Sequence, residues 1–157
     1  MKKESTANLF SYLDEKKLAI CVDELARKNK VCKEAVIVLA WTNLMSKYVL
    51  DDVISVNYFN DIEKEKCCQL SFEDLDDKKI SELLLTAHEI ITDESVYKKV
   101  KISEATDSRQ KGYLVCKLHN SYEPELEELP VKLSLLIDID EDRIGYEIIL
   151  LIPILSS

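Results

Sequence analysis

The feature that most constrains this chain is an apolar run from Ala35 to Trp41, at the centre of the segment from Lys33 to Val49. The β-branched residues in the run would also suit a strand, but apolar residues continue at helical spacing as far as Tyr48. The segment is therefore predicted to be a helix. Because the middle of this helix is apolar on nearly every side, we expect neighbouring elements to bury it on every side.

Two more helices are predicted from the spacing of their apolar residues. The first runs from Leu18 to Ala26, with Asp14 placed to cap its start and Asn29 to end it. The other has one apolar face over 80–91 and follows three aspartates, whose charges suit the N-terminal end of a helix. Both helices are amphipathic, so each is expected to pack one face against a core.

Strands are predicted where β-branched and aromatic residues gather between polar connections. Three such segments lie at 53–59, 67–72 and 113–118. The clearest signal is a hairpin, in which apolar residues alternate over 133–139 and again from Ile144 onward, with an acidic turn between them. The second strand of the hairpin is apolar on both faces near its end, which places it inside a sheet.

These elements predict an α+β fold, in which a mixed β-sheet is packed with about three helices on one side. The chain has 157 residues, of which 46% are hydrophobic, enough for one core of its own. No internal repeat or linker interrupts the sequence. We therefore expect a single domain over residues 1–157.

Charge and hydropathy exclude several kinds of partner. The chain carries 30 acidic and 21 basic residues, a formal charge of −9, and its lysines and arginines form no stripe that could neutralise phosphates. No nucleic acid is expected. The longest apolar run is far shorter than the roughly 20 residues that cross a bilayer, and no secretory signal is apparent. The sequence thus predicts no membrane partner and a cytoplasmic protein.

Cysteine spacing gives no reason to expect a metal or cofactor. The five cysteines are an odd number without a C-x-x-C pair, and only His88 and His119 could join them as ligands. Buried, reduced thiols are expected instead, and the adjacent Cys67 and Cys68 are expected to act independently. The acidic run at 138–142 resembles half of a calcium loop, but it lacks the glycine and the final glutamate that such a loop needs.

Candidates for catalysis are few. His119 follows a predicted strand at the start of a loop and is the best candidate base, although a weak one. Cys116 lies three residues earlier, so the two side chains would point to opposite faces of a strand and could not form a dyad. His88 is expected at the boundary of the third helix. We therefore assign no catalytic, cofactor or metal residue and expect a chain that does not act as an enzyme by itself.

The segment from Leu25 to Ile54 resembles part of the condensation domains of nonribosomal peptide synthetases. Those domains carry a helix ending in L-A, a buried helix containing A-A-W, and then a stretch of the type L-S-R-Y-T-G-x-D-D-V that leads into a strand. The residues at matching places here are Ala40-Trp41, Leu44, Ser46-Lys47-Tyr48 and Asp51-Asp52-Val53-Ile54. The resemblance implies a C-terminal lobe, one of two lobes similar in fold to chloramphenicol acetyltransferase, and the later elements follow in the same order.

Departures from that family bear on function. Its catalysis depends on the motif H-H-x-x-x-D-G, carried by the other lobe, and this sequence contains no His-His pair. Cys32 stands where the family usually has a threonine cap, and Ser55 where a glycine is usual. The resemblance therefore implies a diverged lobe without the catalytic half.

Two functions remain open at this point. The favoured one is a non-catalytic interaction module that docks onto a peptide synthetase, a carrier protein or a second subunit. The alternative is an acyltransferase or condensation subunit that becomes active only when a separate chain supplies the His-His motif. A remoter version of this alternative is a homotrimer in which His119 serves as the base.

Overall fold

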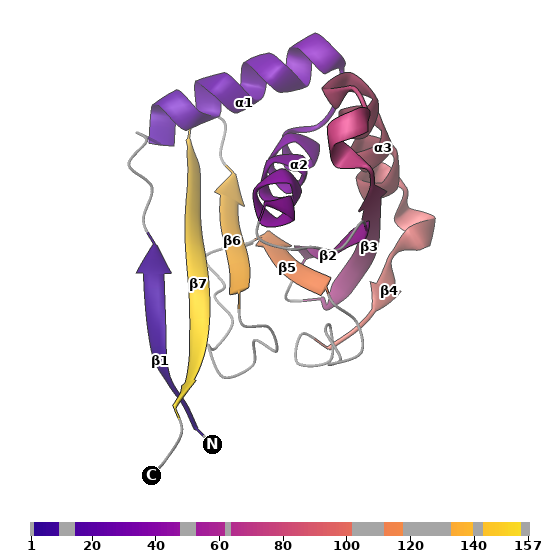
Figure 1. Cartoon of the computed structure of the whole chain (residues 1–157). Coiled ribbons are helices and arrows are strands. Elements are labelled where there is room, and N and C mark those ends of the chain that lie inside the picture. The colour runs from indigo at the N-terminus through magenta and orange to yellow at the C-terminus, as the bar shows by residue number, and fades with distance from the viewer. Residues whose placement is uncertain are drawn as a thin grey trace.

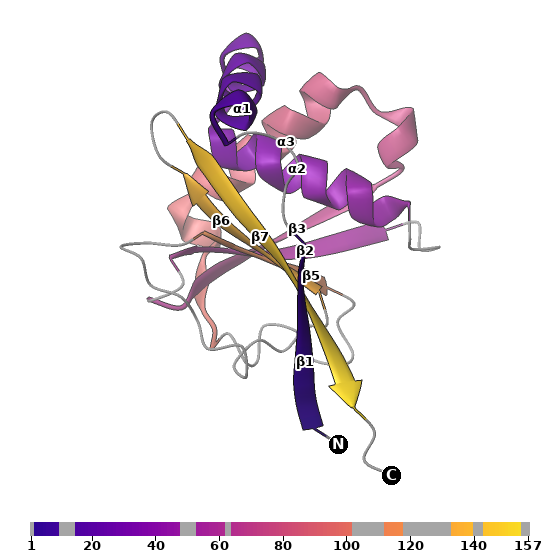
Figure 2. The ribbon, with the colours of Figure 1, turned by 90° about the vertical axis from the view of Figure 1, so that its left-hand side faces the viewer.

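The computed structural model describes residues 2–9, 15–47, 53–61, 64–101, 112–117, 133–139 and 143–154. Three helices lie on one face of a mixed sheet, as Figures 1 and 2 show. The predicted α+β class is therefore confirmed. The helices are α1 (Glu15–Asn29), α2 (Lys33–Ser46) and α3 (Ile80–Thr92), with short 3-10 turns η1 (Leu75–Asp77) and η2 (Glu94–Val96) on either side of α3.

The described strands form a seven-stranded sheet with the order β1-β7-β6-β5-β2-β3-β4. They are β1 (Lys2–Leu9), β2 (Val53–Asp61), β3 (Lys66–Glu73), β4 (Lys98–Lys99), β5 (Gly112–Lys117), β6 (Leu133–Ile139) and β7 (Ile144–Ile154). The three central strands β2, β5 and β6 are parallel, and every other neighbouring pair is antiparallel. The hairpin of β6 and β7 is confirmed, and β7 lies inside the sheet, between β6 and β1.

Strand β1 was not predicted, because its sequence, Lys-Lys-Glu-Ser-Thr-Ala-Asn-Leu, shows no apolar alternation. It pairs with β7 along its length, with Leu9 opposite Ile148 and Thr6 opposite Leu151. The pairing partner, and not local propensity, makes this segment a strand.

A tight joint connects α1 to α2. Lys30 adopts a left-handed conformation with φ of 56°, and the Val31 N–H donates to the Ala26 carbonyl at 2.9 Å. The Asn29 side-chain amide also donates to the Leu25 carbonyl at 2.9 Å. These bonds satisfy carbonyls at the end of α1 and let α2 begin at Lys33. Asn29 thus ends α1 as predicted, while the predicted cap Asp14 lies outside the described residues.

The core lies between the helices and one face of the sheet. On the sheet side it contains Val56, Tyr58, Leu70 and Ile137, all fully buried. Residues that alternate with these point to the other face, where Phe59, Cys67, Cys116 and Leu136 are also buried.

Helix α2 is present as predicted, but the expectation that it is buried on every side is wrong. Its inner face, including Ala35, Val38 and Thr42, is buried against the core. Its outer ridge is open, because Ala40 and Leu44 are exposed, together with Asn43 and Lys47. The helices α1 and α3 pack beside α2 and leave this ridge uncovered. An apolar pattern all round a helix therefore does not establish burial all round it.

Two leucines of α2 test this description. Leu39 is 6% exposed and Leu44 is 41% exposed. Leu39→Ala should lower the free energy of unfolding by about 2–5 kcal/mol, because it removes buried methyl groups and leaves a cavity. Leu44→Ala should change it by less than about 1 kcal/mol. Urea denaturation measures both, and equal losses would show that Leu44 is buried too.

Candidate functional site

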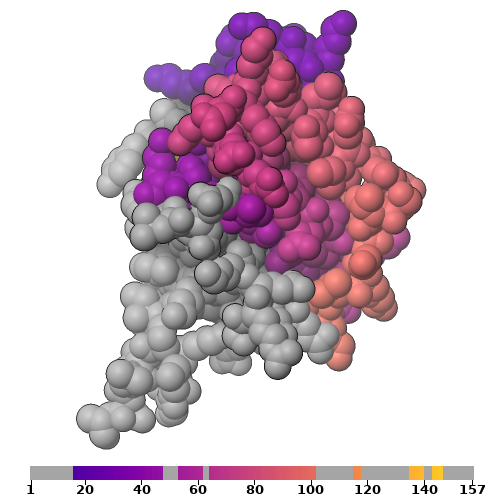
Figure 3. Space-filling model, turned by 45° about the vertical axis from the view of Figure 1, so that its right-hand side comes forward, coloured from indigo at the N-terminus to yellow at the C-terminus, as the bar shows by residue number. Residues whose placement is uncertain are grey.

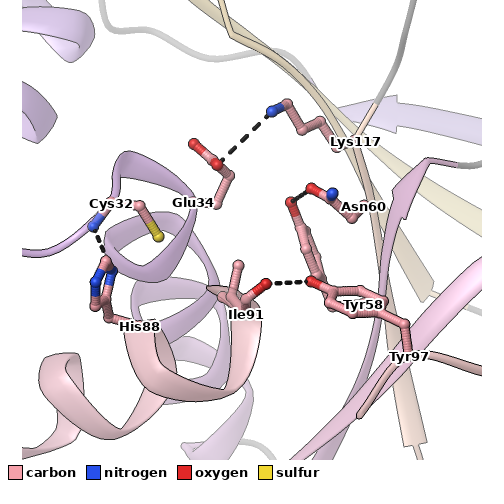
Figure 4. Close-up of polar contacts among 8 residues, drawn as sticks. All are labelled: Cys32, Glu34, Tyr58, Asn60, His88, Ile91, Tyr97 and Lys117. Atoms are coloured by element: carbon pink, nitrogen blue, oxygen red, sulfur yellow. Dashed lines mark hydrogen bonds and ion pairs between the residues drawn. The ribbon is translucent and has the colours of Figure 1, made fainter. Parts of the chain in front are cut away.

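Polar and titratable side chains gather where the carboxyl ends of β2 and β5 meet the start of α2 (Figure 4). Because α2 precedes β2 and runs back across the sheet, its N-terminal turn lies above the end of that strand. In open α/β sheets this edge is the usual place for ligands. We call the group the carboxyl-end cluster; it comprises Cys32, Glu34, Tyr58, Asn60, His88, Tyr97 and Lys117.

His88 fixes the start of α2. Cys32 is the N-cap residue, and its side chain makes no capping hydrogen bond. Its backbone N–H instead donates to Nδ1 of His88 at 2.9 Å, across 56 positions of sequence. In a capping box, a side chain of the same helix accepts this bond. Here α3 supplies the acceptor, so His88 ties the two helices together and its Nδ1 carries no proton.

A partly buried ion pair joins α2 to β5. Nζ of Lys117 lies 3.7 Å from Oε2 of Glu34, and the two side chains are 22% and 20% exposed. Glu34 also stands in the first turn of α2, where a negative charge is favourable. The pair therefore holds the first turn of α2 over the end of β5.

Both tyrosines of the cluster use their hydroxyl groups in hydrogen bonds. Tyr58 donates to Oδ1 of Asn60 at 3.1 Å, and Tyr97 donates to the carbonyl of Ile91 at 2.7 Å. Burial raises the pKa of both phenols well above the usual range, and the charge of Glu34 raises that of Tyr58 further. These hydroxyls remain protonated at neutral pH.

The thiols in and beside the cluster are also held in the protonated form. Burial raises the pKa of Cys32, and it raises the pKa of Cys68 to about 11 and that of Cys67 to about 12. Burial raises the pKa of Cys116 as well. A thiol is a weak nucleophile until it ionises, so none of these four is activated. All five cysteines are free, and Cys21 is exposed, contrary to the expectation of buried thiols.

The structure places two of the three candidate residues named from the sequence. His119 lies outside the described residues, and Cys116 is fully buried on β5. His88 is half-buried, as expected for a boundary position, but its contact with Cys32 was not predicted. No sequence signal reveals that contact, because it depends on how α3 packs against α2. Among the described residues, no group of three His, Cys, Asp or Glu side chains could hold a metal ion.

Comparisons with known proteins bear on the fold alone. No family model matches this chain, and no curated protein gives a significant match. Among solved structures, the chain is similar to the first condensation domain of the CDA synthetase, with a TM-score of 0.62 at 7% sequence identity. The match covers 95% of this chain and 40% of that one. The fold is therefore condensation-domain-like, and this chain spans two fifths of the length of its neighbour.

A search of the described residues for membrane-spanning segments gave a negative result. None of their helices has both the length and the apolar character needed to cross a bilayer.

Replacement of His88 tests its role at the start of α2. His88→Ala should lower the free energy of unfolding by about 1–2 kcal/mol, because it removes the acceptor of the Cys32 N–H. Glu89→Ala, at the exposed neighbouring position, should change it by less than about 0.5 kcal/mol. Amide exchange should quicken at Cys32 in the first variant only. Unchanged exchange at Cys32 would contradict the assigned hydrogen bond.

Alkaline pH should weaken the fold. Unfolded thiols ionise near pH 9, whereas Cys67 and Cys68 keep their protons up to about pH 12 and 11 in the folded state. The folded state thus binds more protons in this window, so stability present below pH 9 is lost as the pH rises. Under reducing conditions, the urea midpoint should be flat between pH 7 and 8 and should fall above pH 9. In a Cys67→Ala, Cys68→Ala variant the fall should be shallower; an equal slope would contradict this assignment.

Proposed function

We propose that this chain is a non-catalytic interaction module, equivalent to the C-terminal lobe of a condensation domain, that binds a protein partner through its helical face. The match in which 95% of this chain aligns with 40% of a condensation-domain chain carries the proposal. The segment that resembles the family over 25–54 extends from α1 through α2 into β2. That position supports the C-terminal lobe.

The chemistry of the carboxyl-end cluster supports a non-catalytic role. Nucleophilic catalysis needs a nucleophile in hydrogen-bond contact with a base. In this cluster the tyrosines donate to an amide and a carbonyl, His88 accepts from a backbone N–H, and the thiol of Cys32 stays protonated. The cluster therefore positions α2 on the sheet, and the sequence lacks the His-His motif of the catalytic lobe.

Exposed apolar side chains support a docking role. Leu25 is 43% exposed, Leu44 is 41% exposed and Ile80 is 67% exposed, and these residues belong to α1, α2 and α3. Large contiguous apolar patches mark interaction sites, and Leu25 and Ile80 line one hollow of this face. We infer that a synthetase, a carrier protein or a second copy of this chain covers it. The proposal places this assembly in the cytoplasm. Thiols are kept reduced in that compartment, which is consistent with five free cysteines.

The test is to mix the purified chain with the products of neighbouring genes, starting with any that carry a carrier-protein domain or a His-His motif. Light scattering should detect a complex. Leu44→Asp should weaken it at least about tenfold, since a charge is buried at the interface. Val96→Asp is the matched control, because Val96 is 37% exposed on η2, away from the outer ridge of α2.

Two results would count against the proposal. If Leu44→Asp and Val96→Asp affected binding equally, or if no partner bound, the helical face would not be the docking surface. The other result is acyl transfer by the mixture of this chain with a protein that carries the His-His motif, when neither chain is active alone. This chain would then be a subunit of an acyltransferase and not a non-catalytic module.

A further inference from the structure

A hollow of about 210 Å³ lies between α1, α2 and the strands β6 and β7. It is separate from the hollow that Leu25 and Ile80 line, although both reach Ala40 of α2. Figure 1 shows α1 lying across the end of the helical layer, and Figure 3 shows it along the upper border of the face that carries α3. The hollow is bounded by side chains of four regular elements, including Val22 on α1, Ile37 on α2, Leu135 on β6 and Ile144 on β7.

The side chains that line this hollow are apolar apart from two groups, the indole N–H of Trp41 and the phenol of Tyr146. An apolar cavity of about 150 Å³ stays dry and holds one molecule of benzene. The hollow here is larger, so it can hold a six-membered ring with about one or two further heavy atoms. It also has an entrance, because Ala40 and Leu44 line it and are exposed on the outer ridge of α2.

Trp41 leaves one hydrogen bond unmade at the wall of this hollow. The residue is 4% exposed, and its Nε1 is buried with no acceptor among the described residues. An indole nitrogen can only donate, and a buried donor without a partner is unfavourable. Every other buried side-chain nitrogen or oxygen of the described residues has a partner. The unpaired donor is therefore specific to the residue that lines the apolar hollow.

The occupant that suits this wall combines apolar bulk with one acceptor oxygen. A water molecule needs two to four polar partners, and the lining side chains offer only the indole of Trp41 and the phenol of Tyr146. An aliphatic side chain from a protein partner would fill the space but would leave Nε1 unpaired. A carbonyl compound does both, because its oxygen accepts from the indole while its carbon atoms contact the apolar walls.

We propose that this hollow binds a small apolar molecule with one carbonyl oxygen, and that Nε1 of Trp41 donates to that oxygen. Nε1 is covered by its neighbours in the structure, so the indole turns its N–H edge toward the hollow as the ligand enters. The χ2 torsion of an indole is broad, which permits a small turn of this kind. The inference does not depend on the proposed function, because a single chain supplies the whole site.

The native protein contains its own probe, since Trp41 is the sole tryptophan of the chain. Its indole N–H should give one signal in a nitrogen–proton correlation spectrum. Cyclohexanone is the test ligand, and methylenecyclohexane, which has nearly the same shape but no oxygen, is its control. Cyclohexanone should move the indole proton signal downfield until the site is saturated, and methylenecyclohexane should not. The absence of a saturable downfield shift with cyclohexanone would overturn the proposal.

Trp41→Phe keeps an aromatic ring in the wall and removes the donor. The substitution should weaken cyclohexanone binding about tenfold and change methylenecyclohexane binding by less than about threefold. Titration calorimetry measures both affinities. The comparison of the two ligands separates loss of the hydrogen bond from any change in the size of the hollow. An equal effect on both ligands would show that Nε1 is not the donor.

Two substitutions on the exposed ridge of α2 locate the site, and they remain available if Trp41→Phe does not fold. Ala40 lines this hollow, whereas Asn43 lines only the second hollow, of about 440 Å³, between α2, η1 and α3. Ala40→Phe should narrow the first hollow and weaken cyclohexanone binding at least about tenfold. Asn43→Phe is the matched control and should leave the affinity within about twofold. Equal affinities in the two variants would overturn the placement.

The outcomes separate this inference from the proposed function. A chain that binds cyclohexanone at Trp41 but binds no protein partner would support the ligand site and overturn the interaction module. A chain that forms a complex through Leu44 but gives no indole shift would do the reverse.

Discussion

The structure depends on the contact between the inner face of α2 and the parallel strands at the centre of the sheet. Ala35, Val38 and Thr42 of this face are completely buried, and the fully buried Val56, Tyr58 and Val115 face them from β2 and β5. The packing of α1 and α3 beside α2 follows from this contact, since each buries its apolar face against the same core. Small and β-branched side chains let the helix approach the strands closely.

Polar contacts then fix where α2 begins. Burial alone would allow the helix to slide along the sheet, because dispersion and the hydrophobic effect have little directionality. The hydrogen bond between Cys32 and His88 and the ion pair between Glu34 and Lys117 have defined geometry at the first turn. A threonine cap would satisfy part of the same need locally. With cysteine at this position, α3 and β5 supply the anchors, through His88 and Lys117.

The sequence predicted those parts of the fold whose signal is local. The helical spacing in α1, α2 and α3 and the alternation in β6 and β7 were sufficient to predict these five elements. Each of them buries a face that its own residues define. Strand β1 could not be predicted, since its polar residues form a strand only by pairing with β7. The open ridge at Ala40 and Leu44 could not be predicted either, because an apolar pattern does not say whether the covering surface belongs to the same chain. The carboxyl-end cluster joins residues far apart in sequence, and single-sequence patterns contain no information on such contacts.

Carbene footprinting with residue-level mass spectrometry tests the central claim most directly: α2 is buried on its inner face and available for docking on its outer ridge. In dilute solution, Leu44 and Ile80 should be labelled while Ala35 and Val38 are not. In concentrated solution or with a bound partner, Leu44 and Ile80 should become protected, and Val96 should keep its label. Labelling of Val38 in the dilute protein, or unchanged labelling of Leu44 in the assembled one, would contradict the account.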